Sequence, residues 1–492
     1  MPLIPLQLKP GMYRNGTEYE QSNRWRDGSL VRWSEGSLRP VGGWTAFTET
    51  AVNAAPRGMH GWRANDDSNN VAVGTYNKLY YISSSGNLTD ITPVGITAGR
   101  EDAEQNTGYG GGYYNVGTYS TPRTPTATYL PATTWAIDNW GEYLVACSID
   151  DGKLYEWQLN TSNPAAVIAN APVNNRSMVV TEERFIFALG SGGNPRKVSW
   201  CDREDNTTWT PAATNEAGDL ELQTSGSIMT ATRVRGRTLI LTDADAHIAT
   251  YQGPPYVYGF ERIGSACGTD SPNSLVAVDQ FAFWMGQKGF FMFNGSVPTE
   301  LNCDVSDYVF RDINTNQISK VYGVHNSRYS EIWWFYPSED SVENNCYVAY
   351  DYKDQIWTFG NLSRTAAIDT GILRYPVWTT ADGYLYFHEY GFNHQGDTTF
   401  VESGPISLGN GDTVMKVNQL IPDELNQGDV TAKFKTRFHP NDTEREYGPY
   451  TMANPTSVRF TGRQMRMRLE TTVNSDWRAG IMRVKATPGG ER

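Results

Sequence analysis

The sequence predicts an all-β fold, a β-propeller of about seven blades followed by a C-terminal β-sandwich-like domain. Three observations lead to this prediction. The composition is rich in aromatic residues and turn formers, with 15 Trp, 28 Tyr, 18 Phe, 47 Gly and 25 Pro. A two-strand unit recurs along most of the chain, and a different alternating pattern replaces it from about residue 400 onward.

The composition and length set the frame for this fold. Aromatic side chains are favoured in strands, and Gly and Pro are favoured in the turns that join them. A chain of 492 residues exceeds what one ordinary hydrophobic core supports, so several domains or one large repeat domain are expected.

The repeated unit consists of an upstream strand, a turn with Gly or Asp, and a second strand with alternating aromatic residues. The second strands are expected at residues 78–82, 153–157, 197–200, 247–251, 289–293, 347–350 and 384–387. The upstream strands are expected at residues 71–73, 143–146, 185–188, 238–241, 281–284 and 332–335. Most second strands follow one another after roughly 40–60 residues, which is close to the roughly 40–45 residues of a propeller blade.

One gap between second strands is longer and holds a Gly-, Tyr- and Pro-rich stretch at about 95–134, which we interpret as an insertion loop. Its candidate interface residues are Tyr109, Tyr113, Tyr114 and Arg123. One interpretation is an interface or channel loop that a partner orders. The alternative is an irregular connection packed on the rim of the propeller.

The predicted domains are an N-terminal arm at 1–56, a propeller at 57–398 and a C-terminal sandwich-like domain at 399–492. The strands of the arm are expected to lead into the propeller or to close it. Helix is scarce. The best candidate covers residues 304–313, with Asp304 placed to cap its first turn.

The C-terminal domain shows apolar and polar residues in alternation at 430–438, 457–460 and 465–470, as half-buried strands do. The last strand is expected at 479–484. This pattern places Arg459, Arg466 and Arg468 on one side of a sheet as further candidate interface residues. Either they form a solvated face, or they form a basic face that docks on an acidic neighbour.

The charge and the cysteines limit the partners and the compartment. A net charge of −13 argues against gripping DNA through a general basic surface, although an acidic wall can guide DNA without retaining it. The 5 Cys lie far apart without a C-x-x-C pair, so we interpret them as buried free thiols made in a reducing cytosol. The N-terminal residues lack the pattern of a signal peptide, and no apolar run is long enough for a membrane helix, so no membrane anchoring by this chain is expected.

No catalytic residue, cofactor or metal site is expected, and the protein is predicted not to be an enzyme. Residues 148–155 nearly match a sialidase-type Asp box but lack its final Thr-Trp, so they are read as a hairpin turn. His388 and His394 are six positions apart, whereas the zincin motif needs two His four apart on a helix. Carboxylate pairs such as Asp243 and Asp245 are read as solvated loop charges, and an approach of two carboxylates across a cleft, as in a glycosidase, stays open.

Three segments carry a resemblance to tail proteins of short-tailed bacteriophages (podophages). Residues 23–33, NRWRDGSLVRW, followed by RPVGGW at 39–44, resemble the opening of these proteins. The insertion followed by WAIDNWGE at 135–142 is similar to them, and so is the C-terminal order that ends in VRFTGRQMRMR at 458–468. The chain thus resembles the packaged-DNA stabilisation family of tail hub or nozzle proteins.

The resemblance implies a structural virion protein made in the cytoplasm of the host bacterium. It implies a homo-hexamer ring below the portal and adaptor proteins of the head–tail connector, extending and closing the DNA channel and retaining packaged DNA. Tail fibres, tailspikes or a needle would dock on the ring, and double-stranded DNA would pass it transiently. Relatives in this family offer no catalytic residues to transfer.

Two alternatives remain from the residues alone. The first is a carbohydrate-active or glycan-binding β-propeller of a tail fibre, whose exposed aromatic residues would be sugar platforms. The second is a cytosolic scaffold propeller, which ranks last because the repeated Gly-His and Trp-Asp signatures are missing.

Overall fold

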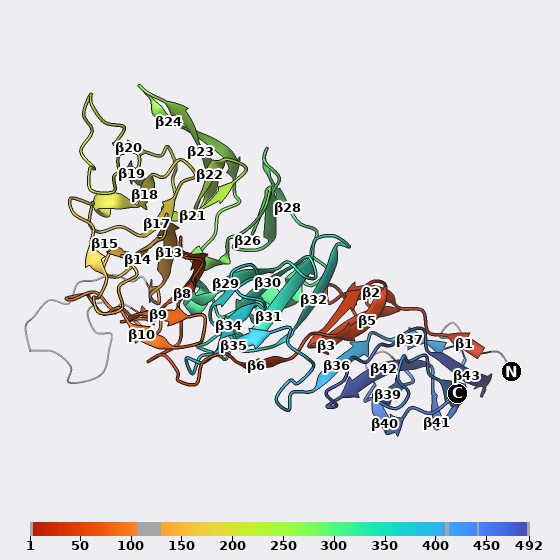
Figure 1. The fold of residues 1–492 in the computed structure, drawn as a ribbon. Coiled ribbons are helices and arrows are strands. Elements are labelled where there is room, and N and C mark those ends of the chain that lie inside the picture. The colour runs from red at the N-terminus through yellow and green to blue at the C-terminus, as the bar shows by residue number, and fades with distance from the viewer. Residues whose placement is uncertain (1–2, 106–128, 409–412, 440–441, 490–492) are drawn as a thin grey trace, which may run out of the picture.

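The computed structural model describes residues 3–105, 129–408, 413–439 and 442–489. Strands dominate this part of the chain. They form a ring of four-stranded sheets on one side of the molecule and a pair of packed sheets, one of four and one of seven strands, on the other (Figure 1). The all-β prediction, a propeller followed by a sandwich-like domain, is therefore confirmed.

The ring consists of seven antiparallel four-stranded sheets within the described residues, which we number as blades 1 to 7. The strands of each blade are given from the inner to the outer one. Blade 1 consists of β7 (Gly58–Arg63), β8 (Asn69–Gly74), β9 (Leu79–Ser83) and β10 (Leu88–Asp90), and blade 2 of β13 (Trp135–Trp140), β14 (Tyr143–Ser148), β15 (Leu154–Trp157) and β16 (Ala166–Val167). Blade 3 consists of β17 (Ser177–Val180), β18 (Ile186–Leu189), β19 (Lys197–Trp200) and β20 (Gly218–Glu221), and blade 4 of β21 (Ile228–Val234), β22 (Arg237–Thr242), β23 (Asp245–Gly253) and β24 (Val257–Ser265). Blade 5 consists of β25 (Val276–Val278), β26 (Phe281–Met285), β27 (Phe290–Phe293) and β28 (Pro298–Glu300). Blade 6 consists of β29 (Tyr322–Asn326), β30 (Glu331–Tyr336), β31 (Cys346–Asp351) and β32 (Ile356–Asn361). Blade 7 consists of β33 (Ala367–Ile368), β34 (Val377–Thr379), β35 (Leu385–His388) and β6 (Trp44–Ala46).

The first strands of the blades contact one another in sequence, from β7 through β13, β17, β21, β25, β29 and β33 and back to β7. This cycle closes the ring around a central axis. Blade 7 takes its outer strand from the N-terminal part of the chain, because β6 pairs with β35. The closure therefore joins residues more than 300 positions apart in the sequence.

The second strands are buried on both faces because each blade is packed between two others. In β30 every residue is buried. Successive side chains of a strand point to opposite faces, so Trp333 packs on Trp378 of blade 7 at 5.2 Å between ring centroids, and Trp334 packs on Phe290 of blade 5 at 4.8 Å. Truncating such a buried aromatic residue to Ala costs roughly 3–5 kcal/mol. Aromatic side chains thus hold adjacent blades together.

The second domain is built from two sheets. The four-stranded sheet has the order β1 (Leu3–Pro5), β43 (Arg483–Pro488), β38 (Met415–Ile421), β41 (Thr456–Gly462). The seven-stranded sheet has the order β2 (Lys9–Met12), β3 (Arg24–Ser29), β36 (Thr399–Ser403), β42 (Gln464–Thr471), β39 (Thr431–Arg437), β40 (Arg445–Thr451), with β37 (Ile406–Ser407) also paired to β42. The two sheets pack face to face, and Phe434 stacks on Phe460 at 4.8 Å across their interface.

The N-terminal strands are divided between the domains. Strands β1, β2 and β3 complete the sheets of the sandwich, and the hairpin of β4 (Val31–Ser34) and β5 (Ser37–Pro40) follows them before β6 enters blade 7. In Figure 1 these red strands lie beside the blue C-terminal ones. Strands β11 (Glu104–Gln105) and β12 (Tyr129–Leu130) pair at the base of the insertion.

Among the described residues, helix is restricted to short segments: α1 (Ser306–Asp312) and the 3₁₀ turns η1 (Ser191–Gly193), η2 (Pro272–Ser274) and η3 (Thr315–Lys320). The helix expected at 304–313 is present, but the predicted cap is wrong. The N-cap position is Val305, and the Asp304 carboxylate instead accepts a hydrogen bond from Arg24 at 2.8 Å. All five cysteines are buried and free, as expected. In the described residues, no helix has the length and apolarity to cross a membrane.

Candidate functional site

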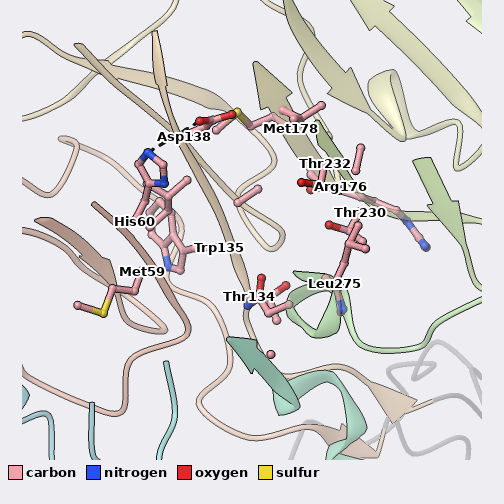
Figure 2. A pocket seen from close by; sticks show the side chains of 18 of the residues that line it. Met59, His60, Thr134, Trp135, Asp138, Arg176, Met178, Thr230, Thr232 and Leu275 are labelled. Atoms are coloured by element: carbon pink, nitrogen blue, oxygen red, sulfur yellow. Dashed lines mark ion pairs between the residues drawn. The ribbon is translucent and has the colours of Figure 1, made fainter. Parts of the chain in front are cut away.

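The propeller encloses a pocket of about 230 Å³ on its axis. Figure 2 shows side chains from several blades around this space, among them His60 from β7, Asp138 from β13 and Thr232 from β21. Residues that precede the inner strand of blade 5 and the first residues of β29 in blade 6 complete the wall. The volume lies below the roughly 300–1,000 Å³ of most small-molecule sites. The axial space is thus on the scale of a small molecule and not of a nucleic-acid duplex.

Hydrogen bonds cross the axis at the face where the inner strands begin. The Asn273 side chain, just before blade 5, donates to the carbonyl of Arg57, just before blade 1, at 2.8 Å. The Tyr322 hydroxyl of blade 6 donates to the Met59 carbonyl of blade 1 at 3.3 Å. Because these blades are not neighbours in the ring, the bonds narrow the axial opening at this face.

Asp138 carries the negative charge of the pocket. One carboxylate oxygen accepts the backbone N–H of Val180 at 3.0 Å, and the other lies 2.9 Å from the Arg233 guanidinium. A charged donor and a backbone donor fill most of the hydrogen-bonding capacity of this carboxylate. Buried charges in proteins are usually paired and hydrogen-bonded in this way. The carboxylate therefore joins blades 2, 3 and 4.

His60 lies beside this carboxylate, with its Nε2 atom 3.8 Å from Asp138 and 3.1 Å from the side-chain oxygen of Asn139. Burial lowers the pKa of His60, and the neighbouring Asp138 only partly opposes this effect. The Asn139 amide nitrogen is engaged with the Gly141 carbonyl, so its oxygen accepts and His60 Nε2–H donates. His60 is consequently neutral at neutral pH.

The pocket supplies polar groups that can hold water or a small polar molecule. Within the described residues, no hydrogen bond joins His60 to a Ser or Thr hydroxyl of the wall, so no nucleophile is paired with a base there. The same part of the chain contains no group of three or more His, Cys, Asp or Glu placed to hold a metal ion.

The arginines predicted for the C-terminal domain do not share one face. Arg466 and Arg468 lie on β42 of the seven-stranded sheet, whereas Arg459 is exposed on β41 of the other sheet. The expected single basic side is therefore wrong, because the turn between β41 and β42 carries the chain from one sheet to the other. Only Arg459 presents its charge to solvent.

Carboxylates of the same chain neutralise the other two arginines. Arg466 is buried and forms ion pairs with Glu18, from the N-terminal segment, and with Glu444 at 3.2 Å. Arg468 lies 2.7 Å from Glu470 and stacks over the ring of Phe400. These charges hold strands of the sandwich together and are not free for an acidic neighbour.

The residues predicted in the insertion, Tyr109, Tyr113, Tyr114 and Arg123, lie outside the described residues. The described base of the insertion is fastened to the propeller. The buried Lys320 ammonium pairs with Asp102, the Gln317 side chain accepts the Ala103 N–H at 2.9 Å, and the Arg57 side chain donates to the Glu101 carbonyl. The base therefore lies against the segments that lead into blades 1 and 6.

The sequence did not single out the residues of the axial pocket. His60, Asp138, Arg233 and Asn273 come from four different blades, and each stands in a local pattern shared by many polar strand or turn residues. What these residues share is a position at or near the inner strand of a blade. This shared position can be recognised only once the order of the strands in the blades is known.

Fold and site together define the protein as a seven-bladed β-propeller with an attached β-sandwich. No family model and no curated protein matches the chain. Among solved structures, virginiamycin B lyase from Staphylococcus aureus is similar at 8% identity, with a TM-score of 0.42, 70% of this chain and 97% of that chain covered. BamB from Moraxella catarrhalis is similar at 10% identity, with a TM-score of 0.39 and coverages of 73% and 96%. Both are β-propellers, and at these identities the likeness concerns the fold alone.

Proposed function

We propose that this chain is a structural subunit of the tail of a short-tailed bacteriophage, in the hub or nozzle ring below the portal and adaptor proteins. In this role it extends and closes the DNA channel, retains packaged DNA, and offers docking surfaces to fibres, spikes or a needle. The task is mechanical and has no catalytic step. A homo-hexamer in the virion tail is the assembly proposed.

The position of the N-terminal segment carries this proposal. The residues that resemble phage tail proteins, 23–33 and 39–44, are the ones that connect the two domains. Strand β3 pairs with β36 in the sandwich, and β6 completes blade 7 of the propeller. Between them, Arg32 is buried against Glu331 and Glu389. A ring subunit that transmits force from one neighbour to the next needs a rigid connection between its two domains, and this segment supplies it.

The axial pocket supports a DNA path outside the propeller. Its volume of about 230 Å³ and the hydrogen bond from Asn273 to Arg57 across the axis leave no passage for a duplex. DNA would therefore run through the opening that several copies enclose. The net charge of −13 suits a wall that a polyanion passes without sticking.

A cryo-EM reconstruction of the virus particle tests the proposal. The expected result is a ring of copies on the portal axis, with a duplex-sized opening between subunits and none through a propeller. A peripheral position in a fibre would contradict the hub assignment, and absence of the chain from purified particles would contradict the structural role altogether.

A further inference from the structure

A groove of about 530 Å³ lies on the side of the propeller between blades 7 and 1, away from the axial pocket. We call it the aromatic groove and define it by Asn69, Ser84, Arg374, Tyr375, Phe387 and Tyr390. Asn69 and Ser84 belong to blade 1, and the other four belong to blade 7 or to the segment that follows it. Its volume is within the roughly 300–1,000 Å³ typical of sites for small ligands.

Three aromatic rings form one wall of the groove. The Tyr375 ring meets the Tyr390 ring edge to face at 5.1 Å and the Phe387 ring at 6.1 Å. Phe387 is supported from behind by Phe47 at 4.5 Å. Such contacts fix the rings without covering them, and Tyr390 remains 49% exposed.

The backbone of this wall is also fixed. The Tyr390 N–H donates to the Gly43 carbonyl at 3.0 Å, so the segment that leaves blade 7 is tied to the segment that enters it. A preformed wall loses little conformational freedom when a ligand binds.

Polar groups that line the groove beside these rings keep donors free. Arg374 is exposed, its guanidinium lies 5.4 Å over the Tyr375 ring, and no carboxylate of the described residues pairs with it. The oxygen of the Asn69 side chain accepts a hydrogen bond from Arg63 at 3.2 Å, which leaves its amide N–H groups for a ligand. Among the described residues, the hydroxyls of Ser84, Tyr375 and Tyr390 have no hydrogen-bond partner either.

We propose that the aromatic groove binds a saccharide, and preferentially one that bears a carboxylate. A sugar ring has an apolar face of C–H groups and a rim of hydroxyls, which match aromatic rings accompanied by amide, hydroxyl and guanidinium donors. Arg374 adds selectivity for a uronate or sialate, because a guanidinium binds a carboxylate through two parallel hydrogen bonds.

This inference goes beyond the proposed structural role, since a tail subunit with such a groove also contacts surface glycans of the host. Binding is measured by isothermal titration with two acidic saccharides, trigalacturonic acid and sialyllactose, and with their neutral counterparts, maltotriose and lactose. The expected result is saturable binding of at least one acidic saccharide, tighter than that of its neutral counterpart.

Three variants connect the binding to the groove. Tyr390→Ala is expected to weaken it by roughly tenfold or more, the effect of removing an aromatic anchor. Arg374→Gln should remove the preference for the acidic saccharide and leave the binding of the neutral saccharide unchanged. Tyr384→Ala is the matched control, because Tyr384 is an exposed tyrosine of the same blade that does not line the groove.

Two results would overturn the assignment. The first is no saturable binding of any of the saccharides to the wild-type protein. The second is binding that Tyr390→Ala and Tyr384→Ala alter equally, which would locate the sugar elsewhere. Circular dichroism and thermal melting of each variant confirm that a loss of binding is not a loss of fold.

Discussion

Arg32 is predicted to be the most sensitive single position for the joint between the domains. Its guanidinium forms two bidentate pairs, with Glu331 at 2.9 and 2.8 Å and with Glu389 at 2.9 and 2.6 Å. The arginine side chain is 2% exposed, and the two carboxylates are 6% and 2% exposed. Arg32→Met keeps most of the volume but leaves two buried carboxylates face to face.

The cost follows from this geometry. Removing one partner of a buried ion pair destabilises a protein by roughly 3–5 kcal/mol. Here one change leaves two carboxylates without their cation, so the upper part of that range is expected at pH 7. At about 1.4 kcal/mol for each factor of ten, the equilibrium ratio of folded to unfolded protein falls by roughly three orders of magnitude. The assay is urea unfolding followed by tryptophan fluorescence.

The penalty is expected to depend on pH. In the native protein, burial raises the pKa of Glu331, and Arg32 opposes this only in part. Burial also acts on Glu389, but there Arg32, Asn326 and the Gly42 N–H prevail and lower its pKa. Without Arg32, burial raises both folded-state pKa values above those of the unfolded chain. Neutral carboxyls then stabilise the variant at low pH, and this contribution is lost as the pH rises through the folded-state values.

A neutral triple variant is the matched control. Arg32→Met combined with Glu331→Gln and Glu389→Gln retains the shapes and removes all three charges, so it should recover much of the lost stability and lose the pH dependence. A loss below about 1 kcal/mol for Arg32→Met at pH 7, or no recovery in the triple variant, would refute the reasoning.

Two further predictions concern the thiols and the sandwich. Burial raises the pKa of Cys147 and of Cys346 to about 12, so the folded protein should not react with a disulfide reagent at pH 8. The urea-unfolded chain should expose all five thiols to the same reagent. Rapid labelling of the native state would contradict this prediction. Arg466→Met should destabilise the sandwich by roughly 1–3 kcal/mol, because it removes a buried cation that pairs with both Glu18 and Glu444 and leaves them only their other arginine partners, Arg437 and, for Glu18, Arg26. Arg459→Met at an exposed site should stay within about 0.5 kcal/mol. Equal effects of the two variants in urea unfolding would show that burial of the ion pairs does not matter.

Much of the propeller could be predicted because its units repeat. All seven second strands of the repeated unit correspond to the third strand of a blade, from β9 to β35, and the six expected upstream strands correspond to second strands. The seventh, β34, was missed. It has three residues, and the irregular segment ending in Pro376 precedes it, so no alternation is long enough to be recognised.

The rest depends on pairings that a local pattern does not contain. Strands β1 and β2 have three and four residues, and β1 pairs with β43 at the other end of the chain. Arg459 and Arg466 share an alternating pattern, yet a turn assigns them to different sheets. Alternation determines which side of a strand is polar, whereas the identity of the sheet is determined by tertiary pairing.

The pairing of N-terminal strands with distant strands couples the folding of the two domains. Residues 3–5 pair with β43, residues 24–29 with β36 and residues 44–46 with β35. Each of these contacts joins the first 46 residues to a strand more than 300 positions away, and such contacts form late because the loop must close first. Neither blade 7 nor the sandwich is complete until the N-terminal segment has entered both. The segment therefore couples the stability of the domains, and the buried Arg32 at its centre makes that coupling depend on one charge cluster.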